Sequence, residues 1–187
     1  MAQSIHVALK AHPANPERFH QRIEVTMTLA ADGGLNLLYA IHGFNLDLRV
    51  PTPHAPAPAE ALWRTTCCEL FVGAPDRPGY REFNFSPSGQ WAAYDFADTR
   101  QPAASPAVLP APTLQTRRSE DLLEVAVNLP AAALPAFGER RCLALAAVLE
   151  AEGGHLGYWA LAHPHGKPDF HHPAGFLIKL DSRGLHP

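Results

Sequence analysis

Alternation of apolar and polar residues is the feature of this sequence that most restricts its fold. In the segment RIEVTMTL, residues 22–29, the side chains of Ile23, Val25 and Met27 share one face of an extended chain, and polar residues take the other face. Such a period of two predicts a half-buried β-strand. The turn ADGG follows, and LNLLYAIH then returns as the second strand of a hairpin.

A second hairpin is predicted over residues 80–96, where SPSG supplies the tight turn between two strands. The faces of its first strand hold Arg81, Phe83 and Phe85 on one side, and Tyr80, Glu82, Asn84 and Ser86 on the other. The polar face points either to solvent, as is usual for an antiparallel sheet, or to a ligand.

The remaining periodic segments predict further strands. They are LWRTTCCELFVG, DLLEVAVNL, CLALAAVLEAEGG, HLGYWALA and FLIKLD. The composition of CLALAAVLEAEGG also suits a helix, but its length, its glycine ending and its neighbours favour a strand. The 19 prolines oppose helix, because proline lacks an amide donor and clashes with the preceding turn. About ten short strands predict an all-β fold, an antiparallel β-sandwich or barrel.

The length of 187 residues suits a single domain over 1–187, with a proline-rich loop at 51–60 inside it. The net charge of −3 comes without a block of one sign, which argues against nucleic-acid binding. No signal peptide opens the sequence, and no apolar run reaches the roughly 20 residues that cross a membrane. Three cysteines, two of them adjacent, suggest free thiols and a cytoplasmic location.

The histidine-rich stretch HPHGKPDFHHP, residues 163–173, is the clearest candidate site. Imidazole and carboxylate groups are metal ligands, so one interpretation is a metal site of His163, His165, Asp169 and His171. Another is a stiff loop at the rim of a ligand pocket, because its prolines restrict the backbone and its polar groups can bond a ligand. In a third, the loop only connects two strands.

Tryptophans near predicted strand ends offer apolar surfaces on which a ligand could stack. Trp63 and Trp159 are the two best placed, since loops flank both. A pocket needs such a platform together with a few polar groups. The polar candidates are Arg64, Glu82, Asn84, His163, Lys167, Asp169 and His171.

Catalytic motifs are weak. The sequence contains no G-x-S-x-G nucleophile elbow and no phosphate-binding glycine loop. Glu69 and Glu82 could form a carboxylate pair for glycoside chemistry, which depends on their separation. Adjacent thiols in an apolar strand, Cys67 and Cys68, suit buried apolar positions better than a nucleophile.

Three stretches together resemble the DOMON-like group of bacterial domains, which is related to the family nine carbohydrate-binding modules. They are LWRTTCCELFVG, YREFNFSPSGQWAAYDF and GYWALAHPHGKPDFHHPAGFLIKL, and the likeness extends from about Ile23 to Leu180. The resemblance implies a jelly-roll-like sandwich with a pocket for sugar or haem. It also implies that Trp63 and Trp159 grip a sugar. Haem-binding relatives use Met with His or Lys, and the only internal methionine here is Met27, on a face expected to be buried.

The sequence therefore predicts a non-catalytic protein that binds a small, sugar-like ligand near residues 163–173, without a cofactor. The alternative is a metal- or haem-binding protein, catalytic or not, that uses the same loop. A further alternative is an interaction module whose pocket is filled by its own side chains.

Overall fold

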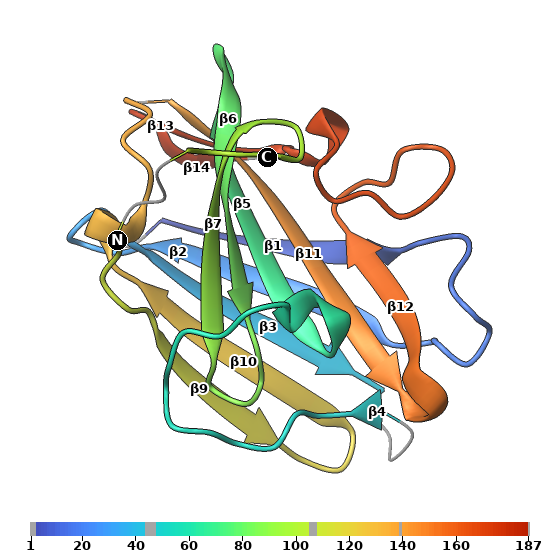
Figure 1. Ribbon diagram of the computed structural model, residues 1–187. Coiled ribbons are helices and arrows are strands. Elements are labelled where there is room, and N and C mark those ends of the chain that lie inside the picture. Colours follow the sequence, from blue (N-terminus) through green and yellow to red (C-terminus); the bar gives the residue numbers. More distant parts are fainter. Residues whose placement is uncertain (1–2, 44–47, 105–107, 139, 187) are drawn as a thin grey trace.

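The computed structural model describes residues 3–43, 48–104, 108–138 and 140–186, in which antiparallel strands dominate (Figure 1). This described part contains no α-helix, only four short 3-10 turns: η1 (Leu62–Arg64), η2 (Ala131–Ala133), η3 (Glu152–Gly154) and η4 (Pro173–Gly175). The predicted all-β, jelly-roll-like antiparallel sandwich is confirmed. None of the helical segments among the described residues is long and apolar enough to span a membrane.

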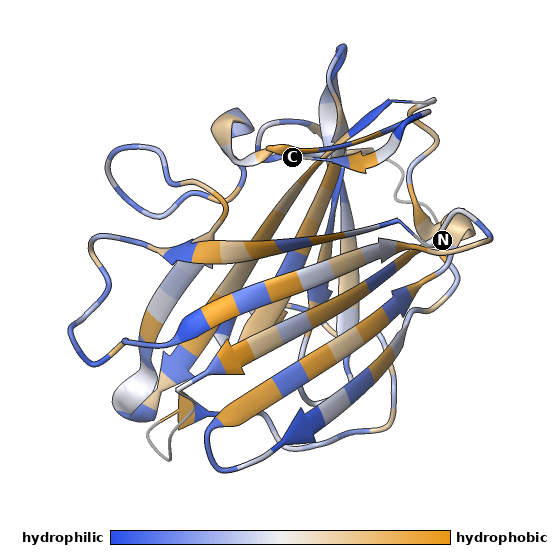
Figure 2. Cartoon of the chain, turned by 180° about the vertical axis from the view of Figure 1, so that it is seen from behind, coloured by the Kyte–Doolittle hydropathy of each residue, from blue (hydrophilic) through white to orange (hydrophobic). Residues whose placement is uncertain are grey.

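The first layer of the sandwich follows the alternation seen in the sequence. Its strands run in the order β1 (Ser4–Ala11), β2 (Arg22–Leu29), β3 (Leu35–His42), β10 (Leu122–Leu129) and β9 (Thr113–Arg118). Figure 2 shows apolar and polar residues alternating along these strands. The predicted hairpin of β2 and β3 is present, with Ile23 opposite Ile41 and Val25 opposite Tyr39.

The second layer carries the longer buried strands. Its order is β8 (Gln101–Pro102), β7 (Trp91–Asp98), β6 (Arg77–Phe85), β5 (Cys67–Ala74), β11 (Arg141–Ala151) and β12 (His155–Ala160). Three short strands extend it: β4 (Leu48–Arg49), β13 (Ile178–Asp181) and β14 (Gly184–His186). Strand β1 joins the layers, because most of it pairs with β2 while Lys10 and Ala11 pair with β12.

The core lies between the layers and is built from the inward residues of each strand. Leu70 and Phe83 of the second layer are fully buried there together with Ile23 and Val25 of the first. The outward residues of β5, and those of β6 from Tyr80 onward, are buried as well. One interpretation of the sequence predicted that the polar face of the 80–96 hairpin points to solvent. The structure contradicts it, because Glu82 is 5% exposed and Asn84 is fully buried.

Two segments differ from the expected strands. LWR, residues 62–64, forms a 3-10 turn after Ala61, whose φ of 56° reverses the chain, and strand β5 begins only at Cys67. Strand β1 was not predicted, although it connects the two layers. The proline-rich residues 51–60 contribute no strand to the sheet. They run beside β7, where Pro58 and Trp91 form an isolated bridge.

The position of Trp159 contradicts the prediction that its ring stacks on a ligand. Its side chain is 1% exposed and packs in the core, edge to face with Phe19 at a centroid distance of 5.7 Å. Its indole nitrogen donates to the Gln21 carbonyl at 3.2 Å. Gly157 lies on the same face, and a Cβ there would come 2.7 Å from the Phe19 ring. Trp159 therefore cannot offer a stacking surface to a ligand.

We expect Trp159→Ala to destabilise the protein by roughly 3–5 kcal/mol, because it removes a large buried ring and leaves a cavity. Trp63→Ala serves as the matched control. Its ring is 40% exposed, so the loss there should be about 1 kcal/mol or less. Urea unfolding followed by circular dichroism measures both values. Equal losses in the two variants would contradict the assignment of Trp159 to the core.

Candidate functional site

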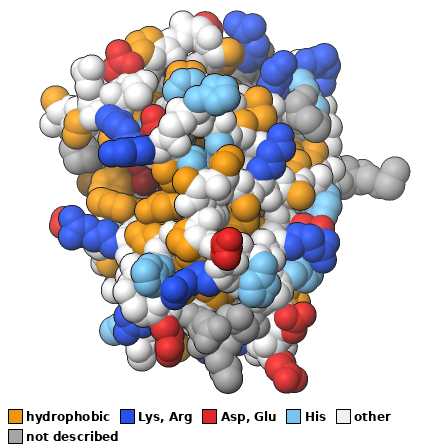
Figure 3. All heavy atoms as spheres, turned by 90° about the vertical axis from the view of Figure 1, so that its right-hand side faces the viewer, with side chains coloured by type: hydrophobic (Ala, Val, Ile, Leu, Met, Phe, Trp, Pro, Cys, Tyr) orange, Lys and Arg blue, Asp and Glu red, His pale blue; other side chains and the backbone are white. Residues whose placement is uncertain are grey.

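A cavity of about 410 Å³ opens on the outer face of the second layer. Its floor includes the outward side chains of β5 and β6, whose inward neighbours lie in the sandwich core. Turn η1 and the segment after β12 contribute to its rim. On this side of the molecule, Figure 3 shows hydrophobic side chains around a hollow that contains an acidic side chain.

Aromatic rings form two walls of the cavity. Trp63 of η1 meets Tyr94 of β7 edge to face, with ring centroids 5.4 Å apart. Tyr158 of β12 meets Phe170 in the same manner at 6.0 Å. Because β6, β5 and β11 lie between β7 and β12 in the sheet, the two aromatic pairs stand on opposite sides of the floor.

Two carboxyl groups lie on this floor. Glu69 of β5 is 2% exposed and Glu82 of β6 is 5% exposed. Burial raises the pKa of Glu69 well above its usual value, and the nearby charge of Glu82 raises it further. Burial also raises the pKa of Glu82, although the Asn84 hydrogen bond and the charge of Arg100 act in the opposite direction. The cavity thus holds two carboxyl groups that retain their protons to unusually high pH.

Asn84 holds the Glu82 carboxyl group in place through a hydrogen bond. Its amide nitrogen donates to Glu82 Oε1 at 2.6 Å, and its amide oxygen accepts from the Cys67 thiol at 3.4 Å. Asn84 is fully buried and does not line the cavity. Its predicted role as a direct ligand contact at this cavity is therefore replaced by a supporting one.

A second chain of hydrogen bonds orients His171. The Arg100 amide donates to the Tyr80 hydroxyl at 3.1 Å, so the Tyr80 proton is free to donate to His171 Nδ1 at 2.6 Å. With the Tyr80 hydroxyl as the donor, the ring proton of His171 is on Nε2, which lies 3.7 Å from Glu82 Oε2. Burial lowers the pKa of His171 to about 4, and the charge of Arg100 contributes. At neutral pH the imidazole is thus uncharged and does not form an ion pair with Glu82.

The structure gathers four of the predicted site residues at this cavity, namely Trp63, Arg64, Glu82 and His171. Three others lie elsewhere. His163 Nε2 contacts the Lys10 carbonyl at 2.7 Å and packs against His12. Lys167 and Asp169 line an adjoining, more open cavity, which shares Arg100 and Pro168 with the first.

The alternative metal site is not formed. Asp169 bonds Arg100 at 2.8 Å, His163 contacts Lys10, and His171 accepts from Tyr80. Within the described ranges, no group of three or more His, Cys, Asp or Glu side chains could hold a metal ion. His163, His165, Asp169 and His171 therefore do not converge as that interpretation predicted. Met27 is fully buried in the sandwich core, as expected, and so cannot serve as a haem ligand at this loop.

Several lining residues were missed as ligand contacts, above all Glu69, Tyr94, Arg100, Tyr158 and Phe170. Alternation within CCELF could have placed Glu69 beside Glu82, since Glu69 is opposite Asn84 in the register. Tyr158 is adjacent to Trp159 and hence points to the opposite face. Arg100 and Phe170 come from irregular segments, and no local pattern marks them.

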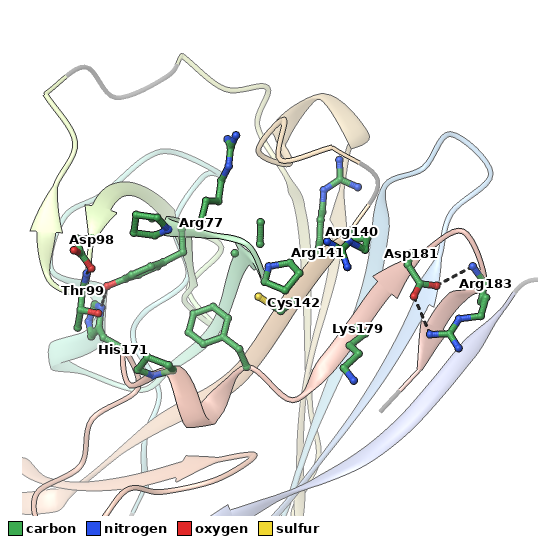
Figure 4. A pocket seen from close by; sticks show the side chains of 18 residues that line it. Arg77, Asp98, Thr99, Arg140, Arg141, Cys142, His171, Lys179, Asp181 and Arg183 are labelled. Carbon is green, nitrogen blue, oxygen red and sulfur yellow. Dashed lines mark hydrogen bonds and ion pairs between the residues drawn. The ribbon is translucent and has the colours of Figure 1, made fainter.

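A larger cavity of about 670 Å³ lies beside the turn between β5 and β6, and His171 lines both cavities. Figure 4 shows basic side chains spread around it, and Arg183 paired with Asp181. Arg140 pairs with Asp76 across an exposed contact of 3.5 Å. The buried Tyr80 hydroxyl, which also belongs to this lining, already bonds His171 and the Arg100 amide, so it needs no ligand as a partner. The smaller cavity, with its buried carboxyl groups, is the better candidate site.

Comparison with known proteins by sequence gives no match to a protein-family model and none to a curated protein. The fold does match solved structures. A candidate carbohydrate-binding protein from Bacteroides uniformis aligns with a TM-score of 0.61 and 17% identity, over 92% of this chain and 84% of that chain.

A family 9 carbohydrate-binding module from Caldicellulosiruptor kristjanssonii, in complex with cellotriose, aligns with a TM-score of 0.56 and 10% identity, over 87% of this chain and 74% of that chain. Its complex with glucose gives a TM-score of 0.53 at 9% identity, over 84% and 76% of the two chains. At these identities the matches establish the shared sandwich fold.

The raised pKa of Glu69 makes stability depend on pH. The folded protein holds this proton to higher pH than the unfolded chain. The resulting stabilisation is complete below the unfolded pKa of about 4.3 and is lost as pH rises through the folded pKa. The variant Glu69→Gln cannot ionise. We expect its stability relative to the native protein to increase between pH 4 and 8, by about 1 kcal/mol or more. Urea unfolding at both pH values tests this, and a pH-independent difference would contradict it.

Proposed function

We propose that the protein is a non-catalytic carbohydrate-binding protein whose ligand occupies the cavity between Trp63 and Tyr158. The observation that carries this proposal is the arrangement of two aromatic pairs around a floor of polar groups. A sugar ring has apolar C–H faces and hydroxyl edges. Aromatic walls suit the faces, while carboxyl groups, an imidazole and a guanidinium suit the hydroxyls.

The size and polarity of the cavity agree with a sugar as ligand. Its volume of about 410 Å³ lies within the roughly 300–1,000 Å³ typical of small-molecule pockets. Glu69 and Glu82 can donate a hydrogen bond when protonated and accept one when ionised. Each can therefore bond a sugar hydroxyl, whether that hydroxyl accepts or donates. The third interpretation of the sequence predicted a pocket filled by its own side chains, which this open cavity does not support.

The fold matches add support of a different kind. The family 9 module was captured with cellotriose and with glucose, which makes these two sugars natural first probes. Other ligand classes have less support here. The described residues offer no set of metal ligands, and the internal methionine needed for the haem interpretation lies in the core.

Calorimetric titration with glucose and cellotriose tests the proposal. We expect saturable binding of at least one of these sugars, and at least a tenfold loss of affinity in Trp63→Ala, because an exposed stacking surface is removed. Val108→Ala is a matched control, since Val108 is fully exposed and lies outside the cavity. The sugar affinity of the Val108→Ala variant should equal that of the native protein.

Calorimetry avoids the loss of fluorescence that accompanies removal of a tryptophan. The sugar recovered after incubation should be unchanged, as a non-catalytic role requires. A flat titration with both sugars, or an unaffected Trp63→Ala variant, would refute binding at this cavity.

A further inference from the structure

The Glu69 carboxyl group faces the cavity. Glu69 is only 2% exposed, and it lines the cavity. Among the described residues, no hydrogen bond or ion pair reaches this carboxyl. The Tyr39 hydroxyl donates to the Glu69 backbone carbonyl at 2.7 Å, and the Asn84 amide opposite is used by Glu82.

A carboxyl group in a largely desolvated cavity is costly to ionise when no protein group bonds it. A ligand that donates to Glu69 would remove this cost. Glu82 lies on the same face of the sheet, two residues from the position opposite Glu69. Its Oε1 atom accepts from Asn84, while its Oε2 atom lies 3.7 Å from His171 and is not bonded to it. The cavity therefore offers a ligand two neighbouring acceptor groups.

The aromatic walls narrow the class of donor. An ammonium group is attracted to the faces of aromatic rings, most strongly where water is excluded. Trp63, Tyr94, Tyr158 and Phe170 surround the two carboxyl groups from opposite sides. Carboxyl groups beneath aromatic walls favour a cation over a neutral hydroxyl.

The other charges around the cavity leave Glu69 uncompensated. Arg100 is paired with Asp169 at 2.8 Å, and its charge acts on Glu82. Arg64 comes from the rim, where its side chain is exposed. The other titratable groups near Glu69 supply no positive charge at neutral pH, because burial raises the pKa of the thiols and phenols and lowers that of the imidazole: Cys67, Cys68, Tyr39, Tyr94 and His171.

We infer that the preferred ligand is an amino sugar with a free, protonated amino group, which Glu69 and Glu82 bind between the aromatic pairs. This inference rests on the proposed function and specifies its ligand class. Binding of the ammonium group favours the ionised carboxyl groups. Since the free protein holds their protons to unusually high pH, binding releases protons.

Calorimetric titration with glucosamine, glucose and N-acetylglucosamine tests the inference. At about pH 6.5 an amine with a pKa near 8 is protonated. Glucosamine should bind roughly tenfold more tightly than glucose, whereas N-acetylglucosamine, which carries no charge, should show no such gain. Repeating the glucosamine titration in buffers of different ionisation enthalpy should reveal proton release.

Glu69→Gln removes the charge and keeps the shape. Within this variant the ratio of glucosamine to glucose affinity should fall to about one, whatever the loss of glucose affinity, and Glu17→Gln, an exposed carboxyl outside the cavity, should preserve the native ratio. The native protein supplies an independent measure, because binding that releases protons should grow stronger as pH rises, as long as the amine of glucosamine stays protonated.

The outcomes separate the two proposals. Equal affinity for glucose and glucosamine would overturn the amino-sugar inference and leave carbohydrate binding intact. An unchanged preference in Glu69→Gln would overturn the role of that residue. If no sugar binds, the proposed function fails, and the inference fails with it.

Discussion

Strands β5 and β6 are buried on both faces, and the arrangement of the cavity depends on this constraint. Leu70 and Phe83 point into the sandwich core. Because neighbouring side chains on a strand point to opposite faces, Glu69 and Glu82 must then point outward. A shift of either strand by one residue would place a carboxyl group among the core residues. The packing of the core thus determines the chemistry of the outer face.

The supporting bonds around the cavity come from distant parts of the chain. Asn84 holds Glu82 within one strand, but His171 is held by Tyr80, whose hydroxyl also accepts from the Arg100 amide. These contacts tie the loop after β12 to the hairpin of β6 and β7. The loop therefore brings a neutral imidazole to the carboxyl pair instead of gathering metal ligands.

Periodicity was sufficient to predict the fold but not the site. Apolar alternation identified the hairpins β2–β3 and β6–β7, because each strand buries one face against the core. In β12 both Tyr158 and Trp159 are aromatic, so composition could not show which one faces inward. The close approach of Phe19 to Gly157 decides this, and it is a long-range contact that no local pattern encodes. Trp159 was consequently assigned to the site in error.

The histidine-rich stretch shows a related limit of sequence reasoning. Of its four histidines, only His171 lines the cavity that holds Glu69 and Glu82. The chain turns repeatedly through 163–173 and directs the other three elsewhere. Density of a residue type along the sequence is therefore a poor guide to convergence in space. Glu69 was considered with Glu82 as a carboxylate pair for glycoside chemistry and not as a ligand contact, because their separation in the sequence does not show that both side chains line one cavity.

The buried carboxyl pair opposes stability, and the rest of the fold must offset that cost. Two neighbouring carboxyl groups in an apolar setting lose hydration and repel each other when ionised. A continuous sheet that passes from one layer to the other through β1, with apolar residues on its inner faces, supplies the compensating burial. Groups that destabilise a protein are commonly retained where they contact a ligand. The physical cost of Glu69 and Glu82 is consequently an argument for their role in binding, because the Asn84 and Tyr80–His171 bonds keep the cavity in place around them.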